Sequence, residues 1–253
     1  MTRTFNLADL FEVVAGAVPE RTAFICGNQR LSYRELDERA TRLASALRAR
    51  GITRGDNVGI ALHNSAEYLE TFLACCKIGA VPANINYRYV AEELRYLLQT
   101  LALKALVYGA SYAGEVGKVA GQVPTLRLLV QTGAPQAVPG APTASVGYET
   151  LLASGEPALH DPERSNTDLY LLCTGGTTGM PKGVMWPHRS LFMGALGGGS
   201  IYFRRPPIER PEELAGLVPQ TPALTFFALA PMMHGAAMWS SLISLYEIGR
   251  AHV

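Results

Sequence analysis

The pattern of apolar residues indicates an α/β protein with mainly parallel sheets flanked by helices. Strand-sized apolar runs alternate with helical patterns between residues 32 and 131, which is typical of parallel strands joined by helices. The chain has 253 residues, of which 48% are hydrophobic and 17% charged, so it can bury a core and is too apolar to be disordered. This length corresponds to roughly one or two domains.

The first predicted helix covers residues 32–50. Ser32 and Glu35 have the spacing of a capping box, in which each side chain accepts a hydrogen bond from the other residue's amide. Apolar residues recur at helical spacing at Leu36, Ala40, Leu43 and Leu47. Gly51 follows two arginines, as is usual where a helix ends.

The rest of the pattern predicts further strands and helices. Strands are expected at 57–62, 81–85, 104–108, 126–131 and 168–173, and helices at 66–76 and 91–98. Asn64 is the expected N-cap of the helix at 66–76. We expect a surface connector at 132–146 and an irregular, proline-rich stretch at 204–222.

Composition argues against several classes of protein. Lys plus Arg number 22 and Asp plus Glu 21, a balance that gives no electrostatic footprint for nucleic acid. The longest apolar stretch, residues 223–239, contains Pro231 and His234 and is shorter than the ~20 residues of a spanning helix. No apolar signal segment precedes Asp9, and the four cysteines lack disulfide-framework or metal-ligand spacing. We therefore expect a cytoplasmic protein without a transmembrane segment or a nucleic-acid partner.

Residues 174–183, which read TGGTTGMPKG, have the composition of a polyphosphate-binding loop. Glycines allow close approach of backbone amides and positive φ angles, threonines add hydroxyl donors, and Lys182 adds a positive charge. The loop differs from the Walker pattern, which requires glycine before the lysine and Ser or Thr after it, whereas Pro181 and Gly183 stand there. A glycine-rich surface loop without a ligand is the alternative.

This loop resembles the signature phosphate loop of the AMP-forming adenylate-forming superfamily, which includes acyl-CoA synthetases, aryl-CoA ligases, luciferases and peptide-synthetase adenylation domains. Residues 31–36, 76–82 and 230–235 resemble other motifs of the superfamily in the same order. Gly175-Gly176, in place of the more usual Ser-Gly, together with the following Val184-Met185-Trp186, is most similar to a subgroup of fatty-acyl-CoA synthetases. The resemblance implies the fold of the N-terminal part of the large domain of these enzymes.

The resemblance also implies roles for individual residues. Contacts with the β- and γ-phosphates of ATP are implied for Thr174, Gly175, Gly176, Thr177, Thr178 and Lys182. Lys182 would act in catalysis by stabilising the pyrophosphate leaving group, and His234 by positioning the substrate beside the acyl and CoA-thiol path. Mg²⁺ is implied as a cofactor, with its ligands mostly outside this chain, and CoA as the co-substrate.

The implied activity is that of an ATP-dependent acyl-CoA synthetase. Such an enzyme converts a carboxylic acid (here a fatty acid), ATP and CoA to acyl-CoA, AMP and pyrophosphate by way of an acyl-adenylate. A carrier-protein-loading adenylation domain and a non-catalytic nucleotide-binding module are the alternatives.

Other chemistry-bearing residues have structural interpretations beside functional ones. Two roles, lining an acyl tunnel or packing in an ordinary core, are consistent with Met232, Met233, Met238, Phe226 and Phe227. A solvated loop is favoured over a CoA-phosphate site for Arg204, Arg205 and Arg210, which lie near Glu209, Glu212 and Glu213. Structural or exposed positions are expected for His63, His160 and His188.

We divide the chain into a first lobe at 1–165, a phosphate-loop segment and incomplete second lobe at 166–246, and a tail at 247–253. Members of the superfamily are longer, so we expect a truncated chain that is inactive by itself. The tail, EIGRAHV, can be back-translated into codons that contain the start of a sequencing adapter, with a stop codon next in frame. We expect a non-native tail, and a native helix end is the alternative.

Overall fold

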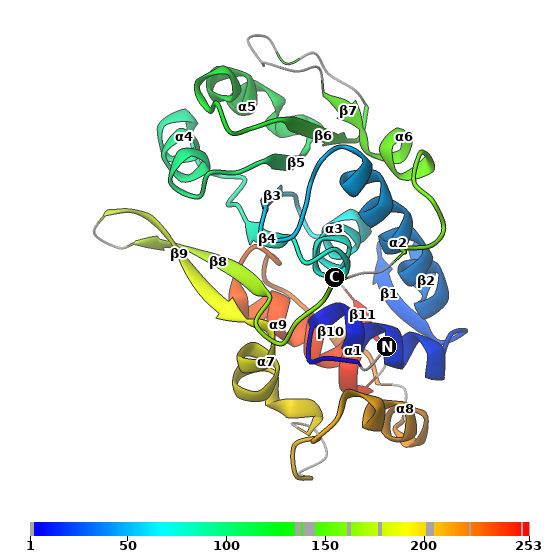
Figure 1. The fold of residues 1–253 in the computed structure, drawn as a ribbon. Helices are drawn as coiled ribbons and strands as arrows, with labels where there is room; N and C mark the ends of the chain where they lie inside the picture. Colours follow the sequence, from blue (N-terminus) through cyan, green and yellow to red (C-terminus); the bar gives the residue numbers. More distant parts are fainter. Residues whose placement is uncertain are drawn as a thin grey trace.

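The computed structural model describes residues 3–134, 138, 145–160, 163–176, 179–200, 205–222, 224–248 and 250–252. Its larger sheet has seven strands in the order β7-β6-β5-β3-β4-β8-β9, and helices lie on both of its faces (Figure 1). Every pair in this sheet is parallel except β8 with β9. The predicted α/β fold with mainly parallel sheets is therefore confirmed.

The strands of the larger sheet are β3 (Asn57–Ala61), β4 (Val81–Asn84), β5 (Ala105–Gly109), β6 (Leu128–Thr132), β7 (Val146–Gly147), β8 (Leu169–Gly176) and β9 (Gly179–Pro187). The helices are α1 (Leu7–Ala17), α2 (Tyr33–Ala49), α3 (Ala66–Lys77), α4 (Ala91–Thr100), α5 (Ala113–Val119), α6 (Tyr148–Ala153), α7 (His188–Ser190), α8 (Leu214–Leu217) and α9 (Gly235–Ile243). Single π-helical turns, Leu191–Ala195 and Ser244–Ile248, follow α7 and α9.

The core lies on the two faces of this sheet. Val58 and Ile60 of β3 and Val107 of β5 belong to the apolar cluster that includes α1, α2 and α3. Leu106 and Tyr108 of β5 belong to a second cluster, with α4 and α5. Because successive side chains of a strand point to opposite faces, an uninterrupted apolar run is what a sheet covered on both sides requires.

Helix α2 begins as the sequence predicts. The amide of Glu35 donates to Oγ of Ser32 at 3.2 Å, and the amide of Ser32 donates to Oε2 of Glu35 at 2.7 Å. This capping box satisfies two amides that otherwise have no partner at a helix N-terminus. The predicted apolar face is fully buried at Leu36, Ala40, Leu43 and Leu47.

Two local predictions are wrong. The N-cap of α3 is Ser65 rather than Asn64, and it makes no side-chain capping bond. The proline-rich stretch 204–222 contains the short helix α8, flanked by 3₁₀ turns at Pro211–Glu213 and Val218–Gln220. Pro211 stands at the first position of its turn, where the missing amide costs no hydrogen bond.

A buried ionic cluster joins three helices to the segment that enters β8. Lys77 on α3 has a side chain only 1% exposed, and its Nζ lies 2.6 Å from Oε1 of Glu12 and 2.8 Å from Oδ1 of Asp37. Arg164 pairs with Asp9 and Glu12, in both cases at 2.8 Å. These contacts hold α1, α2 and α3 together and fix where the chain begins its approach to β8.

The smaller sheet has the order β10-β11-β1-β2, with β1 (Thr22–Cys26), β2 (Gln29–Ser32), β10 (Phe226–Phe227) and β11 (Ala251–His252). Ala251 is buried and is parallel-paired with Phe24 on one side and Phe226 on the other. Strand pairing uses backbone groups, which any residue except proline supplies in full. The pairing is therefore independent of the origin of residues 247–253, and the non-native tail stays a prediction.

Candidate functional site

The described residues of the predicted phosphate loop, 174–176 and 179–183, lie toward the end of the β8–β9 hairpin, which projects from the body of the protein (Figure 1). In the antiparallel register, Thr174 is opposite Lys182 and Gly176 is opposite Gly179. Directly opposed residues have neighbouring side chains on one face of the hairpin. The fold thus places Thr174 and Lys182 on one face of the hairpin, although eight positions of sequence separate them.

These side chains are available to a ligand. Thr174, Gly175 and Lys182 are exposed. In the described part of the chain, Lys182 makes no ion pair. Thr177 and Thr178 lie outside the described residues. An exposed ammonium group that pairs with no described carboxylate is available to bind an anion.

The described glycines of the hairpin do not adopt the positive φ angles that their composition allows. Gly175, Gly179 and Gly183 lie in strands, and none of them has a positive φ angle. A Cβ added at Gly183 would lie 3.1 Å from Cδ2 of Leu101, so this glycine allows close packing of the hairpin on the end of α4. A Cβ at Gly175 would meet the hydroxyl of Tyr89 at an ordinary 3.7 Å.

The site is at the carboxyl edge of the larger sheet. Strands β3, β4 and β8 are parallel neighbours, so their carboxyl ends share one edge. The phosphate-loop segment continues β8 beyond its pairing with β4, which involves Ala83 and Leu171. Open α/β sheets bind ligands outside the carboxyl ends of their strands.

His234 lies at the N-terminus of α9. It is the N-cap residue and is exposed, its amide donates to the carbonyl of Pro231 at 3.0 Å, and its carbonyl accepts from the amide of Met238 at 3.1 Å. The backbone of His234 is thus fixed by a turn and by the first helical hydrogen bond, whereas its ring faces solvent.

Asn64 explains how that turn is held. Its Oδ1 accepts from the amide of Met232 at 2.6 Å, and its Nδ2 donates to the carbonyl of Ala230 at 3.1 Å. The side chain of Asn64 is therefore directed at residues 230–232, and Ser65 is the N-cap of α3. A polar residue is expected between β3 and α3, but local pattern does not reveal that its hydrogen-bond partners lie 166 and 168 positions away.

Asn84, the last residue of β4, makes a second set of contacts that sequence reasoning missed. It is 2% exposed, and its Oδ1 accepts from the amide of Cys173 at 2.7 Å. Its Nδ2 donates to the carbonyl of Cys173 at 3.4 Å and to the carbonyl of Met233. A polar residue that ends an apolar strand was the only available signal.

Burial separates the two interpretations of the apolar candidates. Met232, Met233 and Met238 are at most 1% exposed, as core residues are, whereas Phe227 is 53% exposed. Core packing is the role that the structure gives to the three methionines.

His188, His63 and Arg210 make contacts within the protein that need no ligand. His188 is buried, its Nδ1 accepts from the amide of Leu7 at 3.3 Å, and burial lowers its pKa to about 3, so the ring is neutral at pH 7. The ring of His63 lies 4.0 Å from that of Tyr87. Arg210 pairs with Glu213 in its own exposed turn. Arg204 lies outside the described residues.

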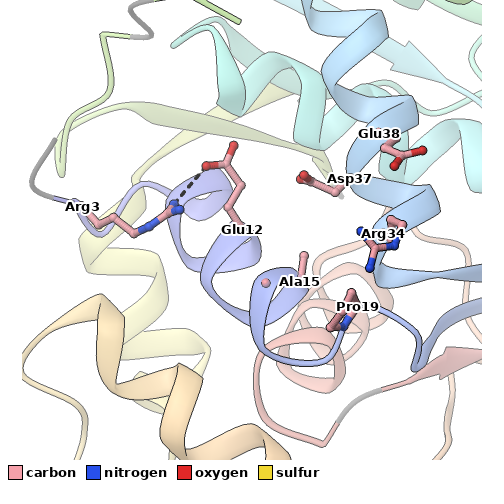
Figure 2. Close-up of a pocket in the computed structure, with 8 residues that line it drawn as sticks. Arg3, Glu12, Ala15, Pro19, Arg34, Asp37 and Glu38 are labelled. Carbon is pink, nitrogen blue, oxygen red and sulfur yellow. Dashed lines mark hydrogen bonds and ion pairs between the residues drawn. The ribbon is translucent and has the colours of Figure 1, made fainter. Parts of the chain in front are cut away.

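A cavity of about 400 Å³ lies between α1 and α2 (Figure 2). It is lined by Arg3, Glu12, Ala15, Gly16, Pro19, Arg34, Asp37 and Glu38. Glu12 and Asp37 are the carboxylates that pair with Lys77, and Arg3 pairs with Glu12 at 3.0 Å. Its polar wall is thus part of the buried ionic cluster, and none of its lining residues is a predicted site residue.

The donor groups of the candidate site suit the phosphates of ATP. The exposed hydroxyl and ammonium groups of Thr174 and Lys182 suit phosphate oxygens. In the part of the chain that the structure describes, no three His, Cys, Asp or Glu side chains gather as a metal site would need. Among the same residues, no helix is both long and apolar enough to span a membrane.

Comparison with known proteins identifies relatives along nearly the whole chain. The sequence model of the family described as "AMP-binding enzyme" matches residues 11–253. A 3-oxocholest-4-en-26-oate–CoA ligase from Rhodococcus rhodochrous is 37% identical over 97% of this chain and 44% of its own length. A medium/long-chain-fatty-acid–CoA/3-oxocholest-4-en-26-oate–CoA ligase from Mycobacterium tuberculosis is also 37% identical, over 96% of this chain and 45% of its own length.

A solved structure shows the same fold. The crystal structure of a protein described as a long-chain-fatty-acid CoA ligase from Rhodopseudomonas palustris superposes with a TM-score of 0.83 at 25% identity. The match covers 98% of this chain and 57% of that protein. The chain thus spans less than half the length of the two curated relatives described above.

Proposed function

The chain belongs to the AMP-binding enzyme family, and on that premise we propose that it is the N-terminal part of an ATP-dependent acyl-CoA synthetase. The whole enzyme joins a carboxylic acid to CoA in two steps. In the first, a carboxylate oxygen attacks the α-phosphorus of ATP, and pyrophosphate leaves. In the second, the CoA thiolate attacks the acyl carbon of the acyl-adenylate, and AMP leaves with the bonding electron pair.

Lys182 and the exposed end of β8 serve the first step. Negative charge accumulates on the leaving pyrophosphate in the transition state, and fixed donors beside it lower the barrier. The opposition of Lys182 and Thr174 at the carboxyl edge of the sheet is the observation that supports this role. Thr177 and Thr178 would add hydroxyl donors, and the amides of Gly175 and Gly176 would approach the phosphate oxygens.

His234 serves to position the acid. Its ring is exposed at the start of α9, and the turn that carries it is held next to the carboxyl ends of β3 and β4 by Asn64 and Asn84. A ring in this place borders the path between the acid and the phosphate loop. Mg²⁺, when bound with ATP, neutralises phosphate charge, and its protein ligands would come from the remainder of the enzyme.

The substrate class is a carboxylic acid with a large apolar part. Relatives that are 37% identical carry the names of fatty-acid and cholestenoate CoA ligases, which supports a fatty or sterol-derived acid here. We also propose the division into a first lobe at 1–165 and the start of a second at 166–246. The chain alone is expected to lack turnover, because it spans 44% of such a relative.

The test is an activity assay of the protein encoded by the complete reading frame. AMP release is measured with ATP, Mg²⁺ and CoA across straight-chain, sterol-derived and aromatic acids, with the 253-residue chain as a control. CoA-dependent AMP release with at least one acid is expected. Absence of ATP consumption with every acid would overturn the proposal, and acid-dependent ATP–pyrophosphate exchange without transfer to CoA would favour a carrier-protein-loading domain.

The origin of the tail has its own test. Genomic sequencing across the codons for residues 247–253 is expected to show a different continuation of the gene. A genomic locus that encodes EIGRAHV followed by a stop codon would show that the tail is native.

A further inference from the structure

We infer that Asn84 is a positioning residue that couples the phosphate loop to the turn carrying His234. This inference rests on the proposed function for its catalytic consequence, but its structural part stands on hydrogen bonds alone. Asn84 is bonded to Cys173, which immediately precedes Thr174, and to Met233, which immediately precedes His234. One buried amide thus holds the residue before each of the two predicted functional groups.

The amide of Asn84 replaces a peptide group. Strand β4 pairs with β8 only at Ala83 and Leu171, and beyond that point the side chain of Asn84 takes over. It accepts from the amide and donates to the carbonyl of Cys173, as a neighbouring strand would do. The strand that leads into the phosphate loop is therefore fixed to β4 to its last buried residue.

The second amide hydrogen of Asn84 bonds to a residue outside the sheet. It reaches the carbonyl of Met233, which is 1% exposed, in the turn before α9. Since all three contacts are buried, removing the amide leaves two carbonyls and one amide without these bonds in an apolar environment. Loss of the Asn84 amide is therefore expected to destabilise both β8 and the turn before α9.

Asn64 provides the contrast that makes the coupling testable. It holds the same turn from the end of β3, through Ala230 and Met232, and among the described residues its side-chain hydrogen bonds do not reach β8. Loss of Asn64 should loosen only the turn, whereas loss of Asn84 should loosen the turn and the phosphate loop together.

The structural arm measures hydrogen–deuterium exchange in the 253-residue chain, in peptides covering 170–183 and 228–238. N84A is expected to speed exchange about 10-fold in both peptides, as loss of a buried hydrogen bond does. N64A is expected to speed exchange only in 228–238. S154A is the control, because Ser154 donates to the carbonyl of Leu151 at 2.6 Å at the end of α6, a helix that packs against α2, β6 and β7. Faster exchange in only one peptide of N84A would overturn the coupling.

The kinetic arm uses the enzyme from the complete reading frame and acid-dependent ATP–pyrophosphate exchange. N84A is expected to lower kcat about 30-fold with KM values for ATP and acid changed less than about 3-fold, since misplacement acts on the transition state. S154A should keep the wild-type kcat. An unchanged kcat in N84A, or a loss confined to KM, overturns the positioning role.

A variant that retains the side-chain volume guards against misfolding. N84D keeps an acceptor for the amide of Cys173 but loses the donors to the carbonyls of Cys173 and Met233. If N84A does not fold, N84D is expected to speed exchange in 228–238 and to lower kcat, and wild-type behaviour in both assays overturns the inference. An inactive wild-type enzyme would instead overturn the proposed function, and the exchange arm would then decide the coupling by itself.

Discussion

Lys77 and Lys182 place the same charged group in opposite surroundings. Lys77 is 1% exposed and lies between the carboxylates of Glu12 and Asp37, whereas Lys182 is exposed and makes no ion pair with any described residue. A buried charge must be paired, so the first lysine is committed to holding helices together. An exposed, unpaired charge adds little to folding and is available for binding.

The same contrast separates the regions around them. The ionic cluster joins α1, α2, α3 and the segment before β8. Its charged groups pair with one another inside the protein. The carboxyl edge of the sheet presents Thr174, Lys182 and His234 to solvent. Asn84 holds the backbones of Cys173 and Met233, which precede Thr174 and His234. Stability and proposed function thus depend on different charges, which makes them separable by mutation.

The largest effect is expected from K77M. Removing the ammonium group leaves two partly buried carboxylates with fewer cations, so the free energy of unfolding should fall by about 3–5 kcal/mol. Urea unfolding at pH 7, followed by circular dichroism, measures the change. A loss below about 1 kcal/mol would mean that solvent already screens the cluster.

Acid should weaken the same cluster through Glu12. Burial would raise its pKa, but the hydrogen bond from Arg164 and the charges of Lys77 and Arg164 outweigh burial and lower it from 4.5 to about 2. A depressed carboxyl pKa stabilises the fold above the unfolded value and loses that stabilisation as pH falls through the folded value. Between pH 4.5 and 2 the wild type should therefore lose on the order of 3 kcal/mol that E12Q does not lose. Parallel pH curves for the two proteins would contradict this.

K182A should lower activity and leave stability nearly unchanged, the opposite of what is expected for the ionic cluster. In the 253-residue chain its free energy of unfolding should stay within about 0.5 kcal/mol of the wild type, because Lys182 is exposed. In the enzyme from the complete reading frame, ATP–pyrophosphate exchange should fall about 100-fold, as for loss of one transition-state donor. Unfolding of K182A, or undiminished exchange, would remove the basis for treating this lysine as a phosphate ligand.

The smallest effect is expected from K118A on α5. Lys118 pairs with Glu115 within the same helix, and its side chain is 60% exposed. Exposed pairs of this kind contribute about 0.5 kcal/mol or less, and the change should vanish in high salt. A cost comparable with that of K77M would show that burial is not what distinguishes the two lysines.

The sequence pattern correctly predicts helices and strands that depend on residues close together in the chain. The capping box of Ser32 and Glu35 and the apolar face of α2 depend on residues within one helix, and both are confirmed. The runs that became β3 and β4 also match their predicted positions to within a residue at each end. Asn64 was misassigned for the opposite reason, because its hydrogen-bond partners lie more than 160 positions away.

What the amino-acid order settles is therefore the kind of fold, the composition of the loop at 174–183 and the family to which the chain belongs. Folding alone decides that Thr174 comes to face Lys182, that Lys77 is buried among carboxylates, and that Asn84 touches the residues before both Thr174 and His234. The reason is that periodicity and capping act over a few bonds along the chain. Hydrogen bonds and ion pairs between distant segments exist only after the sheet has brought those segments together.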